Sequence, residues 1–305
     1  MIAVAILPFS PNLVQDVADM LSHEFMRNAF MAGGCIAAAA GLVGYFVVLR
    51  NQVFTSDALG HVAFTGGLGG LIVGLPLLPS VFGTTILSAV AIGSLGGRER
   101  GRDVAIGTVF AWVLGLGVFF LSIYTTLRSG AAGIVGVTVL FGSILTLTPS
   151  QATVAAGAGL LTGVALLVIC RPLLFAAIDP DVAVTRGVPV RLVTLTFLVL
   201  VGATVAEAVQ AVGALLIFGL LVTPAAIAQN VTARPYAGML LAAVLSTTFV
   251  WLGLVLGFYI SYPVSFFVVG LSFAAYVLSV LLTRRRPRPV PSHTPHEHDQ
   301  RSGLG

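Results

Sequence analysis

Apolar residues occur along this chain in long, nearly continuous stretches separated by short polar segments. The stretches are Phe30–Leu49, Val62–Leu75, Val81–Leu95, Val104–Ile123, Ala152–Ile169, Leu192–Val212, Gly213–Ala228, Tyr236–Phe258 and Val264–Leu282. Most approach the ~20 residues that an α-helix needs to cross ~30 Å of hydrocarbon. They are continuous rather than alternating, which is typical of spanning helices and not of barrel strands. The pattern therefore predicts an all-α, polytopic membrane protein with eight or nine spanning helices.

The two ends of the chain depart from this pattern. Near the start, Leu13, Val17, Leu21 and Phe25 recur at helical spacing among polar residues, which is typical of a helix lying in the membrane interface. We therefore expect an interfacial segment over residues 1–29 and a transmembrane domain over residues 30–283. Residues 284–305 are rich in Pro and charge and poor in apolar residues, a composition that predicts a disordered tail.

The composition agrees with a membrane protein and excludes one kind of enzyme. Only 9% of the 305 residues are charged and the mean hydropathy is +1.05, whereas soluble domains carry roughly 25% charged residues. All 15 basic residues are Arg. A Walker A phosphate loop requires Lys, so we expect this chain not to be an enzyme and any ATP hydrolysis to occur in a separate subunit.

The positions of the Arg residues predict the orientation in the membrane. They cluster in two loops and after the last apolar stretch, at Arg98, Arg100 and Arg102, at Arg171, Arg186 and Arg191, and at Arg284, Arg285, Arg286 and Arg288. By the positive-inside rule these three regions, and with them the C-terminal tail, lie in the cytoplasm. The net charge of +4 then reflects orientation and contact with anionic lipid, not nucleic-acid binding.

Small residues and one proline give further expectations about packing. Glycines recur every four residues at Gly66/Gly70/Gly74, Gly159/Gly163 and Gly253/Gly257, and such ridges let helices approach closely in lipid. Pro224 lies inside an apolar stretch and should bend or interrupt its helix, because proline removes a backbone hydrogen bond. Interrupted helices often line transport pathways, but a bend that only aids packing fits the sequence equally well.

The polar segment after the fifth apolar stretch predicts a short capped helix. Asp179 is a good N-cap, Pro180 suits the first helical position, and Asp181 complements the positive end of the helix dipole. Arg186 falls in the last turn, and Gly187 can adopt the left-handed conformation that ends a helix. From the residues alone, an ordinary connecting helix and a helix that docks on a partner subunit are both open.

Asp57 and His61 form an Asp-x-x-x-His pair where an apolar stretch begins. On a helix, residues four apart share a face with Cβ atoms about 6 Å apart, so both side chains reach one cation. Alternatively, Asp57 is a first-turn acid behind a Thr55 or Ser56 cap and His61 is its local ion-pair partner. A charge in the centre of a spanning helix costs roughly 2.5–3.5 kcal/mol, which favours a divalent-cation site.

Two further polar residues interrupt an apolar stretch. Glu207 and Gln210 lie three residues apart within Leu192–Val212. An intramembrane carboxylate is a functional candidate by default. A protonated Glu207 that only hydrogen-bonds a neighbouring helix explains the sequence equally well, so the role of this pair stays open.

The chain resembles the permease subunits of manganese/zinc-type metal-ion ABC transporters, over about Phe25 to Leu282. Five segments in register carry the resemblance: the opening stretch with its Asp-x-x-x-His pair, "DVAIGTVFAWVLGLGV", "VLFGSILTLTPSQ", "DPDVAVTRGVPV" and "QAVGALLIFGLLVTPAAIAQNVT". The resemblance implies an all-helical permease of about eight spans in a bacterial-type plasma membrane. It also implies a dimer of permeases, two ATP-hydrolysing subunits and an extracytoplasmic metal-binding protein as partners.

The resemblance also implies roles for the candidate residues. Asp57 and His61 would bind the transported Mn²⁺, Zn²⁺ or Fe²⁺, with no permanently bound cofactor, and Asp179–Gly187 would be the helix seated on the ATPase. The chain departs from the family at Gly60, where members usually carry Ser, and at Phe64–Gly66, where a Leu-Pro pair is usual, so the geometry of the site is open. A siderophore- or vitamin-type ABC permease and a proton-coupled secondary transporter are the alternatives.

Overall fold

The computed structural model of the chain is a bundle of helices. It describes residues 19–94, 99–127, 138–211, 213–214, 217–260 and 262–284, without the side chains of 99–106, 127, 210, 211 and 284. Within these ranges every regular element is helical. The prediction of an all-α fold is therefore confirmed.

Twelve helical elements are described. In chain order they are α2 (Glu24–Leu49), α3 (Val53–Val73), α4 (Leu77–Ser94), α5 (Glu99–Leu127), the 3₁₀ turn η1 (Ile144–Thr146), α7 (Pro149–Ile178), α8 (Pro180–Thr185), α9 (Val190–Ala211), α10 (Ile217–Leu221), α11 (Thr223–Val231), α12 (Pro235–Tyr259) and α13 (Val264–Arg284).

Seven of these helices, α2, α4, α5, α7, α9, α12 and α13, are long and apolar enough to cross a membrane. The 21 residues of α3 also reach about 31 Å at 1.5 Å per residue, but α3 carries Asp57 and His61 and is not among the seven. The apolar stretch Gly213–Ala228 is not one span, because α10 ends at Leu221 and α11 begins at Thr223. The seven candidate spans of the described residues are therefore one or two fewer than the eight or nine predicted.

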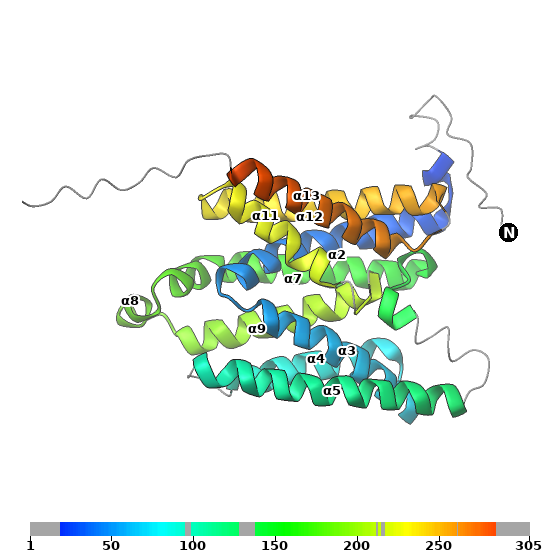
Figure 1. The fold of residues 1–305 in the computed structure, drawn as a ribbon, viewed down its shortest axis with the longest axis horizontal. Coiled ribbons are helices and arrows are strands. Elements are labelled where there is room, and N and C mark those ends of the chain that lie inside the picture. Colours follow the sequence, from blue (N-terminus) through cyan, green and yellow to red (C-terminus); the bar gives the residue numbers. More distant parts are fainter. Residues whose placement is uncertain are drawn as a thin grey trace, which may run out of the picture.

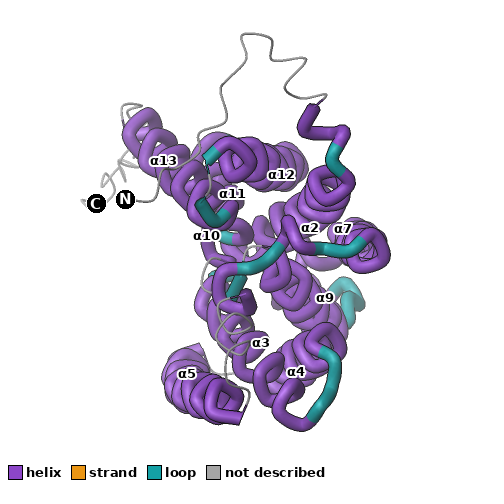
Figure 2. Tube along the Cα trace, turned by 90° about the vertical axis from the view of Figure 1, so that its right-hand side faces the viewer, coloured by secondary structure: helices purple, strands orange, loops and turns teal. Residues whose placement is uncertain are grey.

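The long helices lie side by side along the longest axis of the molecule (Figure 1). Viewed down that axis, α2 packs between α7 and α12, and α9 lies between α2 and α4 (Figure 2). At the edge of the bundle, α5 packs against α3. The broken pair α10 and α11 lies beside α2, α12 and α13, so it is enclosed by full-length helices.

Small residues bring the helices of the core into backbone contact. A Cβ on Gly159 of α7 would lie 3.0 Å from the backbone of Cys35 in α2, and one on Gly41 would lie 2.5 Å from the carbonyl oxygen of Ala242 in α12. Close approach of this kind supplies dispersion contacts that stabilise helix pairs where lipid removes the hydrophobic drive. The alanine- and glycine-rich sequence of α2 therefore explains its central place.

The glycine ridge of α3 receives α4. Gly66 faces Thr84 and Gly70 faces Ser80, with no room for a Cβ at either position. Gly74 ends α3 in the left-handed conformation, with φ of 88°, which glycine adopts without steric cost. The predicted use of glycine spacing for tight packing is confirmed on this helix.

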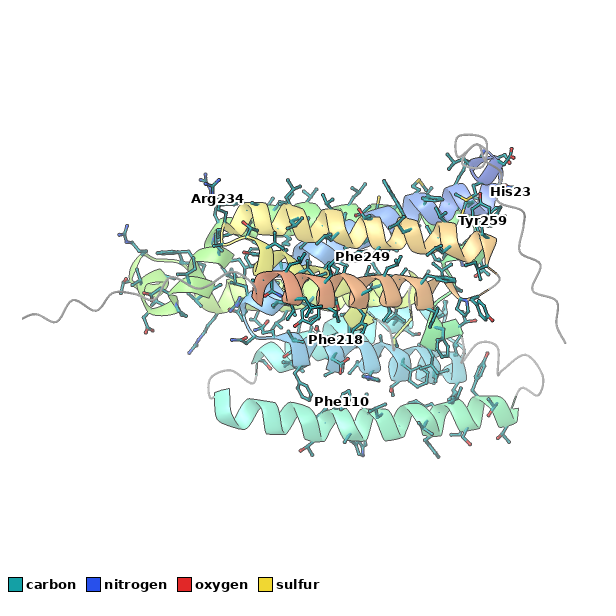
Figure 3. The ribbon with its side chains drawn as sticks, turned by 45° about the horizontal axis from the view of Figure 1, so that its top comes forward. His23, Phe110, Phe218, Arg234, Phe249 and Tyr259 are labelled. Carbon is teal, nitrogen blue, oxygen red and sulfur yellow. The ribbon has the colours of Figure 1, made fainter. Side chains whose placement is uncertain are left out.

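The two ends of the bundle differ. The short helix α8, the first residues of α9 and the start of α12 at Arg234 lie at one end, here called the α8 end, and His23 and Tyr259 lie at the opposite end (Figures 1 and 3). Residues 24–29 of the expected interfacial segment are the first turns of α2. Residues 1–18 and 285–305, which complete that segment and the expected tail, lie outside the described residues.

Candidate functional site

Asp57 and His61 lie on α3, close to its start. The chain leaves α2 through a tight turn in which Asn51 has φ of 51°, and α3 then begins at Val53. Asp57 is thus the fifth residue of the helix, and the first turn contains no acid. The alternative in which Asp57 marks the helix start behind Thr55 or Ser56 is therefore wrong.

The two side chains share one face of α3 and are both half-buried. Residues one helical turn apart have Cβ atoms about 6 Å apart, so both side chains can reach one cation. In the described part of the chain, no hydrogen bond or ion pair holds the Asp57 carboxylate. No ion pair between Asp57 and His61 occurs among the described residues, although the carboxylate is close enough to act electrostatically on the imidazole.

The neighbours of α3 define where this face points. The His61 ring packs edge-on against Phe110 of α5, with centroids 4.8 Å apart and planes at 85°. On the adjoining face, a Cβ on Gly60 would lie 3.2 Å from Ile217 of α10. Successive residues turn by about 100°, which places Asp57 between the directions of Gly60 and His61. Asp57 therefore faces the sector between α5 and α10.

The figures show the same sector. Viewed down the bundle, α5 and α10 flank α3 on the side away from α4 and α9 (Figure 2). Phe110 of α5 and Phe218 of α10 lie on either side of α3 (Figure 3). The contact from the α10 side is made by Ile217, whereas Phe218 is 44% exposed.

His61 lies inside the bundle rather than at its end. Its partner Phe110 follows the first residue of α5 by 11 residues, which corresponds to about 16 Å along a helix. The whole of α5 has 29 residues, or about 43 Å. In addition, α3 begins further from the α8 end than α5 and α9 do (Figure 1). The candidate span within α5 begins at Gly107, so Phe110 lies only about 5 Å into it. His61 is therefore close to the α8 end of the spanning region, where a charge costs less than at the centre.

The pair offers few ligands. No cluster of three or more His, Cys, Asp or Glu side chains that could hold a metal occurs in the described residues. Structural Zn²⁺ sites usually have four protein ligands. Two ligands from α3, completed by water, backbone carbonyls or a second subunit, suit an ion that is held briefly and released.

Glu207 lies elsewhere in the bundle. It is 1% exposed on α9, and its Oε1 accepts a hydrogen bond of 3.2 Å from Thr162 Oγ1 of α7. Its Oε2 has no hydrogen-bond partner among the described residues. The structure therefore does not bring Glu207 to Asp57 and His61. Gln210 lies in the last turn of α9, and its side chain is outside the described set.

The short helix α8 has the predicted caps. The Asp179 carboxylate accepts a hydrogen bond of 3.0 Å from the Val182 N–H, and Pro180 occupies the first helical position. Arg186 is the C-cap, and Gly187 has φ of 78°. The prediction of a helix of about two turns, capped at both ends, is confirmed, but Arg186 follows the last turn instead of lying in it.

This helix lies at the outermost point of the α8 end (Figure 1). Its described side chains are exposed except for Ala183, and they include the apolar Val182 and Val184, which are 41% and 61% exposed. Asp181 and Arg186 add charges of opposite sign beside them. An exposed apolar surface with a charged rim is typical of a protein–protein contact.

Pro224 interrupts its helix as predicted. The carbonyl that loses its helical hydrogen bond is bonded instead by a residue that the sequence did not suggest. A helix with proline at position 224 lacks the N–H that would bond the Leu220 carbonyl. Ser246 of α12, which is fully buried, donates its hydroxyl to that carbonyl over 3.0 Å. No periodicity or motif marks Ser246, because its role depends on a partner 26 residues away.

Comparison with known proteins identifies the family. Residues 22–283 match the model of the ABC 3 transport family. The chain belongs to this family. The resemblance seen in the sequence is therefore confirmed, and so is the multi-pass membrane character of this ABC 3 permease.

Named relatives cover most of the permease. It is 27% identical to the manganese import system permease protein ScaB of Streptococcus parasanguinis, with 92% of this chain and 100% of that protein aligned. It is 28% identical to the manganese transport system membrane protein MntC of Halalkalibacterium halodurans, with 76% and 78% aligned.

A solved structure has the same fold. PsaBC from Streptococcus pneumoniae in complex with Fab superimposes with a TM-score of 0.76 at 24% identity and covers 88% of this chain and 95% of that chain. The predicted all-helical permease fold is confirmed by this match.

Proposed function

We propose that this chain is the membrane-spanning subunit of an ATP-driven importer of divalent transition-metal ions, with Mn²⁺ the first candidate. The observation that carries the proposal is the pairing of Asp57 and His61 on one face of α3, inside the bundle and against Phe110. The relatives named for manganese transport support the choice of metal.

The two side chains suit a transported ion. A carboxylate and a neutral imidazole together accept Mn²⁺, Fe²⁺ or Zn²⁺, and availability rather than the ligand set decides among them. Conduction requires a site that binds well enough to fill and weakly enough to empty. Asp57 supplies the charge that compensates the cation, His61 supplies a nitrogen ligand, and the edge contact with Phe110 fixes the imidazole ring.

ATP hydrolysis is assigned to a separate subunit. The chain has no Lys for a Walker A loop, and the exposed Val182 and Val184 on α8 offer that subunit a docking surface. Because α8 connects directly to α7 and α9, a displacement of α8 is transmitted into the bundle. The residues at the two ends of α8 keep it helical and fix where it starts and stops for this contact. They are Asp179, Pro180, Asp181, Arg186 and Gly187.

The remaining partners follow from the same assignment. The positive-inside rule supports a cytoplasmic α8 end and C-terminal tail, and the opposite end would then receive metal from an extracytoplasmic binding protein. A second copy of the permease would complete the pathway and the ligand shell beside the sector between α5 and α10. The assembly lies in a bacterial-type plasma membrane.

Metal-selective growth rescue tests the proposal. The permease is expressed with the neighbouring genes for its ATPase and binding protein in a host that lacks Mn²⁺ uptake. We expect rescue at limiting Mn²⁺ and loss of rescue in Asp57→Asn and His61→Gln, with His23→Gln at the opposite end as the histidine control. Rescue by Zn²⁺ or Fe²⁺ alone would reassign the metal. Rescue without the ATPase gene would favour a proton-coupled transporter, and uptake of a metal chelate with both variants active would favour a siderophore-type permease.

A further inference from the structure

The break between α10 and α11 leaves backbone carbonyls that need partners. In a continuous helix the N–H of residue 224 would bond the carbonyl of Leu220, but proline has no N–H. In a membrane interior, with no water available, an unsatisfied carbonyl costs several kcal/mol. The neighbours of Leu220 therefore decide whether α10 is held in place.

Two neighbouring helices receive the broken segment. Ser246 of α12 is fully buried and donates a hydrogen bond of 3.0 Å to the Leu220 carbonyl. The next carbonyl, that of Leu221, lies against Gly44 of α2, where a Cβ would overlap the oxygen. The segment at the break is thus held by α12 through one hydrogen bond and by α2 through one close backbone contact.

The segment at the break touches the helix that carries Asp57 and His61. Ile217, one turn before the break, is 2% exposed and lies 3.2 Å from the position of a Cβ on Gly60. Gly60 is adjacent to His61 and three residues after Asp57. A continuous path of contacts therefore runs from Ser246 through α10 to the part of α3 between the two proposed ligands.

We propose that Ser246 is a positioning residue for the metal site: it replaces the hydrogen bond that Pro224 removes and so fixes α10 against Gly60. This inference rests on the proposed function, because it assigns Ser246 a role in placing Asp57 and His61. Ser246 does not touch the metal. Its hydroxyl sets the position of α10, and α10 sets one wall of the sector that Asp57 faces.

The test compares Ser246→Ala with a matched serine. Ser279 of α13 is also buried, at 7% exposed, but its hydroxyl bonds Tyr276 within its own helix, so Ser279→Ala is the control. In the permease reconstituted with its ATPase, we expect Ser246→Ala to raise the half-saturating Mn²⁺ concentration about fivefold, the effect of one lost hydrogen bond. The maximal uptake rate and the amount of folded permease should stay unchanged, and Ser279→Ala should match the wild type.

The same Ser246→Ala substitution made in a Pro224→Ala protein tests whether Ser246 acts by bonding the Leu220 carbonyl. Pro224→Ala supplies the missing N–H, so Ser246→Ala should change Mn²⁺ affinity less than about twofold in that background. Equilibrium Mn²⁺ binding to the solubilised complex gives the same comparison without turnover. An equal loss of affinity in both backgrounds, a loss of folded protein alone, or no change in Ser246→Ala would each overturn the proposal. If Asp57→Asn abolishes Mn²⁺ binding while Ser246→Ala leaves it unchanged, only this inference fails. If Asp57→Asn also leaves binding intact, the proposed function itself fails.

Discussion

Thr162 of α7 donates a hydrogen bond of 3.2 Å to Glu207 of α9, and both side chains are buried. These are the two helices that α8 joins. A buried polar contact between them, in a region of otherwise apolar packing, ties them at a point remote from α8. If α8 is displaced by a partner, α7 and α9 are therefore expected to move together.

The first prediction concerns this tie. Glu207→Gln should preserve the thermal stability of the solubilised permease, because the amide oxygen accepts the same hydrogen bond without a charge. Thr162→Val should lower stability by about 1–3 kcal/mol, since it leaves the buried carboxyl without its partner. Thermal unfolding in detergent measures both effects.

A double variant distinguishes the loss of the Thr162–Glu207 hydrogen bond from the loss of either side chain alone. Thr162→Val combined with Glu207→Leu removes both polar groups, and such replacements are often nearly neutral. We expect the double variant to recover most of the stability lost in Thr162→Val. Additive losses would contradict the tie.

The second prediction concerns the cap of α8. Asp179→Ala removes the acceptor for the Val182 N–H and should cost about 1 kcal/mol of local helix stability. We expect weaker co-purification of the ATPase subunit, and recovery in Asp179→Ser, which retains a capping oxygen. Val184→Asp, which places a charge on the exposed apolar surface, should weaken the same association. Unchanged co-purification in both Asp179→Ala and Val184→Asp would show that α8 only connects α7 to α9.

The third prediction concerns the aromatic contact of His61. Phe110→Ala removes the ring that packs edge-on against the imidazole, and we expect a several-fold higher half-saturating Mn²⁺ concentration. Trp112 on the same helix is 70% exposed, so Trp112→Ala is the matched aromatic control and should leave Mn²⁺ uptake at the wild-type level. Equal effects of the two substitutions would mean that α5 acts through its general packing.

The fourth prediction tests the backbone contact at the break. Gly44→Ala would place a methyl group on the Leu221 carbonyl oxygen and should destabilise the bundle by at least the 1–3 kcal/mol typical of overpacking. Gly83→Ala in α4 meets nothing within 4 Å and should be tolerated. The yield of folded permease after membrane extraction distinguishes them, and a normal yield of Gly44→Ala would contradict the close contact.

Local and periodic features of this molecule were predictable from its sequence. The seven long apolar helices follow from the length of the apolar stretches, because length and apolarity alone decide whether a helix can cross lipid. The ends of α8 follow from Asp179, Pro180 and Gly187, because caps are formed by residues next to each other in the chain. The spacing of Asp57 and His61 similarly places both on one face wherever the helix starts.

Features that depend on distant segments were not predictable. Thr55 and Ser56 are good N-cap residues, which makes Asp57 a candidate first-turn acid, but α3 begins earlier, at Val53. The contact of His61 with Phe110 and the bond from Ser246 to Leu220 join residues from different helices. Such pairs leave no local signal, since an isolated aromatic or serine in an apolar helix has many possible partners.

The central claim is that Asp57 and His61 together bind the transported ion. Equilibrium binding of Mn²⁺ to the purified complex, compared among the wild type, Asp57→Asn, His61→Gln and the double variant, tests it most directly. We expect each single variant to weaken binding at least tenfold and the double variant to be little worse than either, because two ligands of one ion act as a unit. Wild-type affinity in both single variants, with α3 intact, would contradict the claim.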